Sequence, residues 1–563
     1  MRAAFHVVVP FAVLLSALTP HAAWAGRQPA VAARLPAAVA RQFDAYCNDG
    51  SLPSYSWVPS ASADPVKRSS WLIFMKGGGV CDSPERCVAR WNDLPNPATG
   101  VNDGIDDHEI GDHWTMTSYD PQGNINASRN FDGGGILDFD GVGPAGQQPP
   151  AQTNPFDGFN RLYLHYCSSD GWRGRGGEQW VHLSPAQLAY NAGNGPLDVD
   201  YVEPPPLPGR AGNILFAGAN IAEAVFTLLA HSGLTDGGEI VLAGSSGGAL
   251  GVITNLDAFA DILRDAGSTA TLYGVVDSVT AVISGDPEVP RGEGAGDFWS
   301  GDAAAGLPYA PTLVEWDLAG DQDCRAKVAA DPLLATNPFY CASTSNLVLT
   351  EVETPFLVAV NSHDVVVHDR LVPIALVNVA RDASGGTCDD VLDLMIDAFW
   401  AETLTDAELE DGLGAAGYGG LPGCGFSRGD VASMRTQVVP WIRNAITDSV
   451  SFIGEGTRVG GLKRFGYYVP NYDGLHQLLA EGTGQRMFYS DWTASVGGTL
   501  DPQLGVHHAI VNGNGDGGTT DNHSLADALR QFRAMVLNPA LAAPDGSPAP
   551  YRVRNDYWTR VVP

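Results

Sequence analysis

The chain has 563 residues, of which 44% are hydrophobic and 17% charged, so it can bury a large core and lacks the composition of a disordered protein. Its 32 basic and 64 acidic residues give a formal net charge of −32, which argues against nucleic acid and anionic membranes as partners. The length fits one enlarged domain or two ordinary ones.

The first 25 residues have the pattern of a secretory signal. Arg2 precedes an apolar run over residues 7–18, and Ala23-Trp24-Ala25 supplies the small-x-small pattern of a cleavage site. The run is too short to span a bilayer. We therefore expect cleavage after Ala25 and a mature protein that is secreted, extracellular or periplasmic, with no later membrane anchor.

Eight cysteines become disulfide candidates if the protein is secreted. Eight cysteines allow about 105 full pairings, so the sequence does not give the connectivity. Cys81 with Cys87 and Cys324 with Cys341 are candidate pairs because short loops close easily. The others are Cys47, Cys167, Cys388 and Cys424.

Apolar, β-branched runs alternate with helical patterns along the chain, which predicts parallel strands joined by crossover helices. Because the runs are nearly continuous, we expect a mostly parallel sheet covered by helices on both faces. This makes residues 26–563 one enlarged α/β domain, with insertions at about 100–153 and 380–460. The expected strands lie in 69–79, 161–167, 239–245, 271–278 and 355–362, and a helix is expected at 217–233.

The stretch GEIVLAGSSGGALGVITNL, residues 238–256, combines a strand, a G-x-S-x-G turn and a helix from Ala249 to Phe259. This context is typical of a nucleophile elbow, in which a serine sits on a sharp turn. It predicts Ser246 as the nucleophile and the Gly247 amide as an oxyanion donor. The competing interpretation is an ordinary serine in a glycine-rich loop.

A serine nucleophile needs a base and an orienting acid, which in this architecture follow it in the order acid, histidine. Asp364 follows an expected strand and is the candidate acid, although it could instead cap its loop. His476 follows the last apparent strand and is the candidate base. His507 and His508, farther along, are the alternatives.

The oxyanion hole needs a further donor from a loop after an early strand, and MKGGGVC, residues 75–81, fits. Its glycines let successive amides turn toward one point, so Gly78, Gly79 and Val80 are candidate donors. A phosphate-binding loop is the competing interpretation, but neither glycine-rich phosphate signature accompanies these residues.

Several motifs resemble the pectin acetylesterase and Notum family in order and spacing. They are CNDGSLPSY at 47–55, WLIFMKGGGVC at 71–81, NPFDGFNRLYLHYC at 154–167 and GSSGGALG at 244–251. In the tail, TPFLVAVNSHD, YYVPNYDGLHQLL and SLADALRQF resemble the family's acid strand, histidine loop and closing helix.

The resemblance covers roughly residues 42–536 and implies an α/β-hydrolase-like fold that hydrolyses carboxylic esters. It implies Ser246, Asp364 and His476 as the triad. Gly78, Gly79, Val80 and Gly247 would then surround the oxyanion. It also implies that residues 490–522 are an insertion.

This sequence departs from the family pattern near the site, and the loss of a Trp beside the oxyanion loop bears on the substrate more than on catalysis. Lys76 stands where the family has Glu, and Val80 replaces a Trp. Ser245 and Gly247 replace the Cys and Ala beside the nucleophile. Gln477, rather than the Cys of many members, follows His476.

We therefore expect a secreted serine carboxylesterase that deacetylates a polysaccharide such as pectin, or cleaves a related O-acyl ester, through an acyl-enzyme. The alternatives are a catalytically inactive binding protein on the same fold and a lipase-, peptidase- or polyester-depolymerase-type hydrolase. We expect no cofactor. A structural Ca²⁺ at NGNGDG, residues 512–517, is disfavoured because position twelve of such a loop would be His523 instead of Glu.

Overall fold

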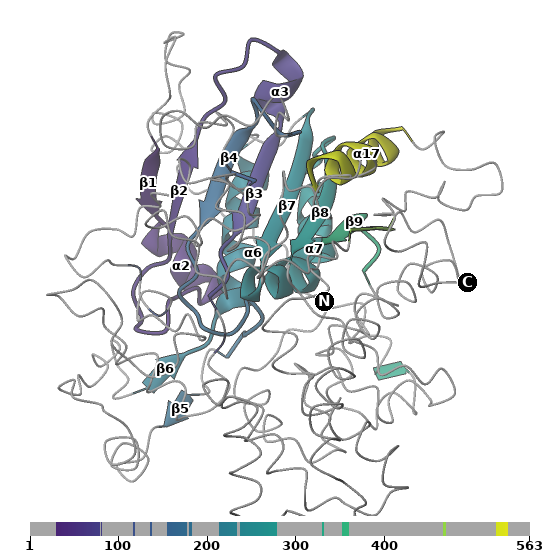
Figure 1. Ribbon diagram of the computed structural model, residues 1–563. Helices are drawn as coiled ribbons and strands as arrows, with labels where there is room; N and C mark the ends of the chain where they lie inside the picture. The colour runs from purple at the N-terminus through teal and green to yellow at the C-terminus, as the bar shows by residue number, and fades with distance from the viewer. Residues whose placement is uncertain are drawn as a thin grey trace, which may run out of the picture.

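The computed structural model describes residues 30–78, 80, 116, 118, 136–137, 155–176, 180–182, 213–232, 237–277, 329–330, 352–359, 465–468 and 525–538. In these residues an eight-stranded sheet has the order β1-β2-β4-β3-β7-β8-β9-β10, and β5 pairs with β6 in a small second sheet (Figure 1).

The strands of the large sheet are β1 (Val31–Arg34), β2 (Ser54–Val58), β3 (Trp71–Met75), β4 (Asn160–Leu164), β7 (Glu239–Ser245), β8 (Thr271–Asp277), β9 (Phe356–Ala359) and β10 (Phe465–Tyr468). The small sheet contains β5 (Trp180–His182) and β6 (Asn213–Leu215). The helices are α2 (Ala37–Phe43), α3 (Pro65–Ser69), α6 (Gly218–His231), α7 (Gly247–Asp265) and α17 (Leu525–Leu537).

The large sheet is parallel from β4 to β10, whereas β2 runs antiparallel to both of its neighbours. The expected mostly parallel sheet is therefore confirmed, with an antiparallel edge that the sequence reading did not include. In this sheet β3 and β4 have exchanged places relative to their order in the chain, and β2 is antiparallel to its neighbours. This is the strand order of the α/β-hydrolase fold. Every residue of β3 and β7 is buried, as in a sheet covered on both faces.

Helices α7 and α17 cover opposite faces of the sheet. Tyr273 and Val275 share a core cluster with Leu529 and Phe532 of α17. Gly274, between them, faces the other way, because a Cβ there would lie 2.9 Å from Leu256 of α7. Helix α6 packs beside α7 through stacked rings of Phe226 and Phe259, with centroids 4.0 Å apart. Figure 1 shows α17 near the beginning of β7 and β8.

Most expected elements are present with shifted ends. Helix α7 begins at Gly247 rather than Ala249 and continues past Phe259 to Asp265. The helix extends because residues 260–266 contain no glycine or proline, and Gly267, just after it, takes a φ of 75°. The expected signal at residues 1–25, the segments 380–460 and 490–522, and nearly all of 100–153 lie outside the described residues.

In the part of the chain that the structure describes, none of the helices has the length and apolar character needed to cross a membrane.

A buried ion pair joins α17 to the beginning of β7. Arg533 Nη2 and Nε lie 2.6 and 2.7 Å from the two carboxylate oxygens of Glu239, and Tyr273 Oη donates to the same carboxylate at 3.0 Å. The guanidinium also covers the ring of Phe159, 5.4 Å from its centroid. Helix α17 is thus held to the central strand by geometry that satisfies both carboxylate oxygens.

Replacing Arg533 by methionine should lower the free energy of unfolding by about 3 kcal/mol, because it leaves the Glu239 carboxylate buried without its cation. The side chains of this pair are 27% and 6% exposed. Arg264→Met is the control, since the Arg264 and Asp261 side chains are 70% and 54% exposed, and it should cost less than about 0.5 kcal/mol. Urea unfolding measures both, and equal losses would contradict this role of the ion pair.

Candidate active site

The turn between β7 and α7 holds Ser246 in a strained backbone conformation. Its φ of 54° and ψ of −123° lie in a region that residues with a Cβ rarely adopt. Its amide donates to the carbonyl of Asp277 at the end of β8, at 2.9 Å. The side chain is half-buried at the N-terminus of a 19-residue helix. Strained backbones of this kind are common at functional sites. Here the turn places the Ser246 hydroxyl at the carboxyl edge of the parallel sheet.

Glycines make this turn possible by removing side chains where backbones meet. A Cβ on Gly248 would lie 2.0 Å from the Met75 carbonyl oxygen, and one on Gly244 would lie 2.4 Å from the Gly248 carbonyl oxygen. Both distances are shorter than any real contact, so β3, β7 and the start of α7 approach each other only because these positions are glycine.

The expected oxyanion loop lies directly against the nucleophile. A Cβ on Gly77 would be 3.1 Å from the Ser246 Cβ and 2.3 Å from the Ser245 carbonyl oxygen. Gly78 has a φ of 135°, which favours glycine, and Val80 is buried. Gly247 is the first residue of α7, where helix amides point outward. The third glycine of the loop, Gly79, lies outside the described residues.

A buried carboxylate, Asp277, anchors the turn on its other side. Its side chain accepts a hydrogen bond from Ser245 Oγ at 3.1 Å, and its own backbone carbonyl accepts the Ser246 amide. Since β7 and β8 are parallel neighbours, these bonds tie the turn to the adjacent strand end. The sequence reading missed Asp277, although it ends an expected strand.

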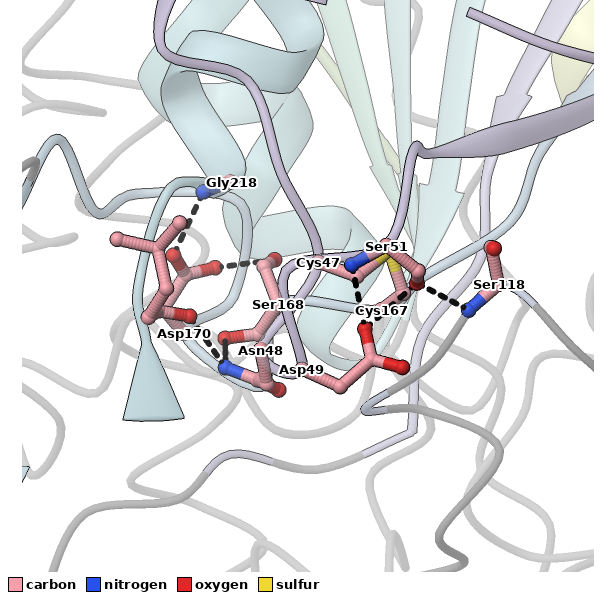
Figure 2. The surroundings of a disulfide bond; sticks show 10 residues. Cys47, Asn48, Asp49, Ser51, Ser118, Cys167, Ser168, Asp170 and Gly218 are labelled. Carbon is pink, nitrogen blue, oxygen red and sulfur yellow. Dashed lines mark hydrogen bonds between the residues drawn. A yellow bond between two sulfur atoms is a disulfide. The ribbon is translucent and has the colours of Figure 1, made fainter. Parts of the chain in front are cut away.

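The segment that follows β4 forms a buried polar junction around Asp170 (Figure 2). Its carboxylate accepts hydrogen bonds from Ser168 Oγ at 2.6 Å and from the amide of Gly218, the first residue of α6, at 2.7 Å. The amides of Trp172 and Gly174 donate to it at 2.9 and 3.1 Å. Burial raises the pKa of Asp170 to about 6, although these four hydrogen bonds lower it.

A disulfide between Cys47 and Cys167 joins the N-terminal segment to the same junction. Beside it, Asn48 Nδ2 donates to the carbonyls of Ser168 at 2.8 Å and Leu215 at 2.6 Å, so β6 is tied in as well. Figure 2 shows the disulfide next to the Asp49–Ser51 turn, with the Asp170 group to one side. The other six cysteines, including the pairs considered from the sequence, lie outside the described residues.

The expected acid and bases, Asp364, His476, His507 and His508, also lie outside the described residues. The strands expected to precede the first two are present: β9 ends at Ala359 and β10 at Tyr468. Both run parallel to β7, so their carboxyl ends lie at the sheet edge where Ser246 sits.

In the described ranges, His, Cys, Asp and Glu side chains form no group of three or more that could hold a metal ion. The suggested Ca²⁺ loop at residues 512–517 is outside these ranges.

Sequence reasoning missed Asp170 and Trp172 because their partners are distant in the chain. Trp172 Nε1 donates to the Lys76 carbonyl at 2.8 Å, and Asp170 contacts the start of α6. The available signal was the run SSD, residues 168–170, directly after the expected strand over residues 161–167, since polar residues at the carboxyl end of a parallel strand often serve a site.

The sheet order and the serine turn define an α/β-hydrolase-like protein. Residues 34–96 and 143–282 match the family model described as Pectinacetylesterase. This match includes the glycine loop, the disulfide and the serine turn, and it confirms the resemblance seen in the sequence over these residues. It ends before Asp364 and His476, whose roles stay predictions.

Curated relatives match about two fifths of the chain. The palmitoleoyl-protein carboxylesterase NOTUM of Drosophila melanogaster is 27% identical over 236 residues, covering 41% of this chain and 26% of that protein. For palmitoleoyl-protein carboxylesterase notum2 of Xenopus laevis the identity is 26%, covering 41% of this chain and 34% of that protein. Pectin acetylesterase 11 of Arabidopsis thaliana is 24% identical, covering 39% of each. The chain thus spans about a quarter to two fifths of the length of these relatives.

Among solved structures, the Wnt deacylase Notum from Drosophila aligns with a TM-score of 0.37 at 22% identity, covering 58% of this chain and 70% of that chain.

Replacing Gly248 by alanine should lower the free energy of unfolding by more than about 2 kcal/mol, because the new Cβ meets the backbone of β3. Gly267→Ala is the control at the opposite end of α7. It has a φ of 75° and nothing within 4 Å of its Cβ position, so it should cost only backbone strain of about 1 kcal/mol. If thermal or urea unfolding ranked Gly267→Ala as the more damaging change, this packing account would be wrong.

The titration of Asp170 should make stability fall as the pH rises. Its folded pKa of about 6 exceeds the ordinary value of 3.8, so the stabilisation from its proton is complete below that ordinary value and is lost as the pH passes about 6. Between about pH 4 and about pH 7, the wild type should lose about 2 kcal/mol relative to Asp170→Asn, which cannot titrate. Urea unfolding of both proteins gives the difference. A relative gain by the wild type over this range would instead mean that the four donors hold the carboxylate ionised.

Proposed function

We propose that this protein is a serine carboxylesterase that cleaves O-acyl esters through an acyl-enzyme at Ser246. One observation carries the proposal: Ser246 has a strained backbone at a strand-to-helix turn, with a glycine loop against its Cβ. A strained serine at a helix N-terminus beside a second source of amides is the arrangement that acyl transfer requires.

In the proposed mechanism the Ser246 hydroxyl attacks the ester carbonyl while His476, oriented by Asp364, takes its proton. The Gly247 amide and the amides of Gly78, Gly79 and Val80 stabilise the oxyanion of the tetrahedral intermediate. The alcohol leaves with the proton from the histidine. Water then attacks the acyl-enzyme by the same route and releases the carboxylic acid and the free serine.

The family match supports an ester as the substrate, and the names of the relatives suggest two versions of it. One is acetyl on a polysaccharide such as pectin, and the other is a long acyl group on a protein. We favour the acetylated polysaccharide, in keeping with the description of the matching family model. The disulfide Cys47–Cys167 supports an oxidising, extracellular or periplasmic location.

Labelling of the purified protein with a fluorophosphonate probe, followed by turnover of p-nitrophenyl acetate, tests the proposal. Ser246→Ala should abolish labelling and reduce turnover by about a thousandfold or more, because it removes the nucleophile. Ser232→Ala, at the end of α6, is the matched control and should keep both. A wild type that neither reacts with the probe nor turns over the ester would favour the binding-protein alternative.

The same assay separates the candidate partners of Ser246. His476→Ala should abolish turnover, whereas His507→Ala and His508→Ala should retain it. Asp364→Asn should reduce turnover more than Asp277→Asn, because Asp277 holds the turn through Ser245. Loss of turnover confined to His508→Ala would move the base to the later loop.

A further inference from the structure

A fully buried tryptophan beside the candidate site has an unusual backbone. Trp172 is 0% exposed, and its φ is 62°. A bulky residue at positive φ is strained, and it persists only where its surroundings fix it. Trp172 contacts both α7, which begins directly after Ser246, and the start of the glycine loop that faces Ser246.

Three contacts fix the backbone of Trp172. Its amide donates to Asp170 Oδ1 at 2.9 Å, and its carbonyl accepts Asn255 Nδ2 of α7 at 2.9 Å. Gly251, one turn nearer the nucleophile, lacks a Cβ that would lie 2.6 Å from the Trp172 Cβ. Trp172 therefore packs directly against α7, and hydrogen bonds hold both its amide and its carbonyl.

The indole, in turn, fixes the start of the glycine loop. Trp172 Nε1 donates to the carbonyl oxygen of Lys76 at 2.8 Å, and both residues are buried. The Lys76 carbonyl and the Gly77 amide belong to one planar trans peptide. Holding the carbonyl therefore also sets the direction of the Gly77 N–H. Glycine backbones rotate more freely than those of other residues. A hydrogen bond from outside the loop therefore has its largest effect on peptides like these.

We propose that Trp172 is a positioning residue for the oxyanion loop, setting the orientation of the Lys76–Gly77 peptide relative to Ser246 through its indole N–H. This role rests on the proposed esterase function. Trp172 links α7, which carries Ser246, to the loop on the other side of the reacting carbonyl. This link holds the glycine loop and the start of α7, which supply the proposed oxyanion donors, at a fixed separation. Electrostatic stabilisation of a transition state requires such fixed donors.

A tryptophan that only fills space would act differently when changed. Loss of packing lowers stability without altering the ratio of transition-state to ground-state binding. Loss of the restraint on the loop lowers kcat and leaves KM nearly unchanged, because the oxyanion donors act mainly in the transition state.

Two variants separate the hydrogen bond from the packing. Trp172→Phe removes the N–H with part of the ring, and replacement of Trp172 by benzothienylalanine exchanges only the N–H for sulfur. Trp71→Phe is the matched control, since Trp71 is a buried tryptophan at the opposite end of β3. The measurements are kcat and KM for p-nitrophenyl acetate, inhibition by a trifluoromethyl ketone, and amide hydrogen exchange of the peptide over residues 71–80.

Both Trp172 variants should lower kcat by about tenfold with KM changed less than about twofold, and should weaken the ketone by about the same factor as kcat. They should also speed exchange in the loop, whereas Trp71→Phe should change neither kcat nor exchange at residues 76–80. Normal kcat and normal loop exchange in the benzothienylalanine variant would overturn the proposal.

Failure of the proposed function looks different in the same experiment. A wild type without turnover would refute the esterase, and loop exchange alone would then decide whether Trp172 restrains the loop. Unchanged exchange in that case would overturn the positioning role as well.

Discussion

The structure depends on one close approach of backbones, between the end of β3 and the start of α7. Gly248 lies where a Cβ would be 2.0 Å from the Met75 carbonyl oxygen, and Gly77 lies where a Cβ would be 2.3 Å from the Ser245 carbonyl oxygen. This approach brings a loop of amides against the Ser246 side chain. Any larger residue at either position would separate the two, so the site exists only while both remain glycine.

Buried polar contacts stabilise this approach from the outside. Asp277 holds the serine turn from β8, and Asp170 holds the segment that carries Trp172. The Ser245–Asp277 bond joins the ends of β7 and β8, and the Asp170–Gly218 bond joins the segment after β4 to the start of α6, so the carboxyl edge of the sheet acts as one connected unit. The ion pair between Glu239 and Arg533 performs the corresponding task at the opposite edge, far from the candidate chemistry.

The local part of this arrangement can be predicted from the sequence. The strand over residues 239–245 and the turn at Ser246 are correctly predicted because their signals lie within about twenty consecutive residues. Strand β2 was not predicted, since a run of only five residues, SYSWV, carries little signal. The glycine loop was expected near the nucleophile only from its composition and from family resemblance.

The roles of Asp170 and Trp172 could not be predicted in the same way. Their hydrogen bonds reach Gly218 and Lys76, which are 48 and 96 positions away in the chain. Nothing in a single sequence connects such positions, because they meet only after the sheet has formed. The disulfide between Cys47 and Cys167, separated by 120 positions, was inaccessible for the same reason.

The central claim is that Ser246 carries the acyl group during turnover. The most direct measurement is rapid acid quenching of the enzyme with p-nitrophenyl acetate, followed by mass mapping of the acetylated peptide. The account predicts a burst of p-nitrophenol equal to the enzyme concentration and acetyl on Ser246. Acetyl on the neighbouring Ser245, or turnover with no acyl-enzyme at any serine, would contradict it.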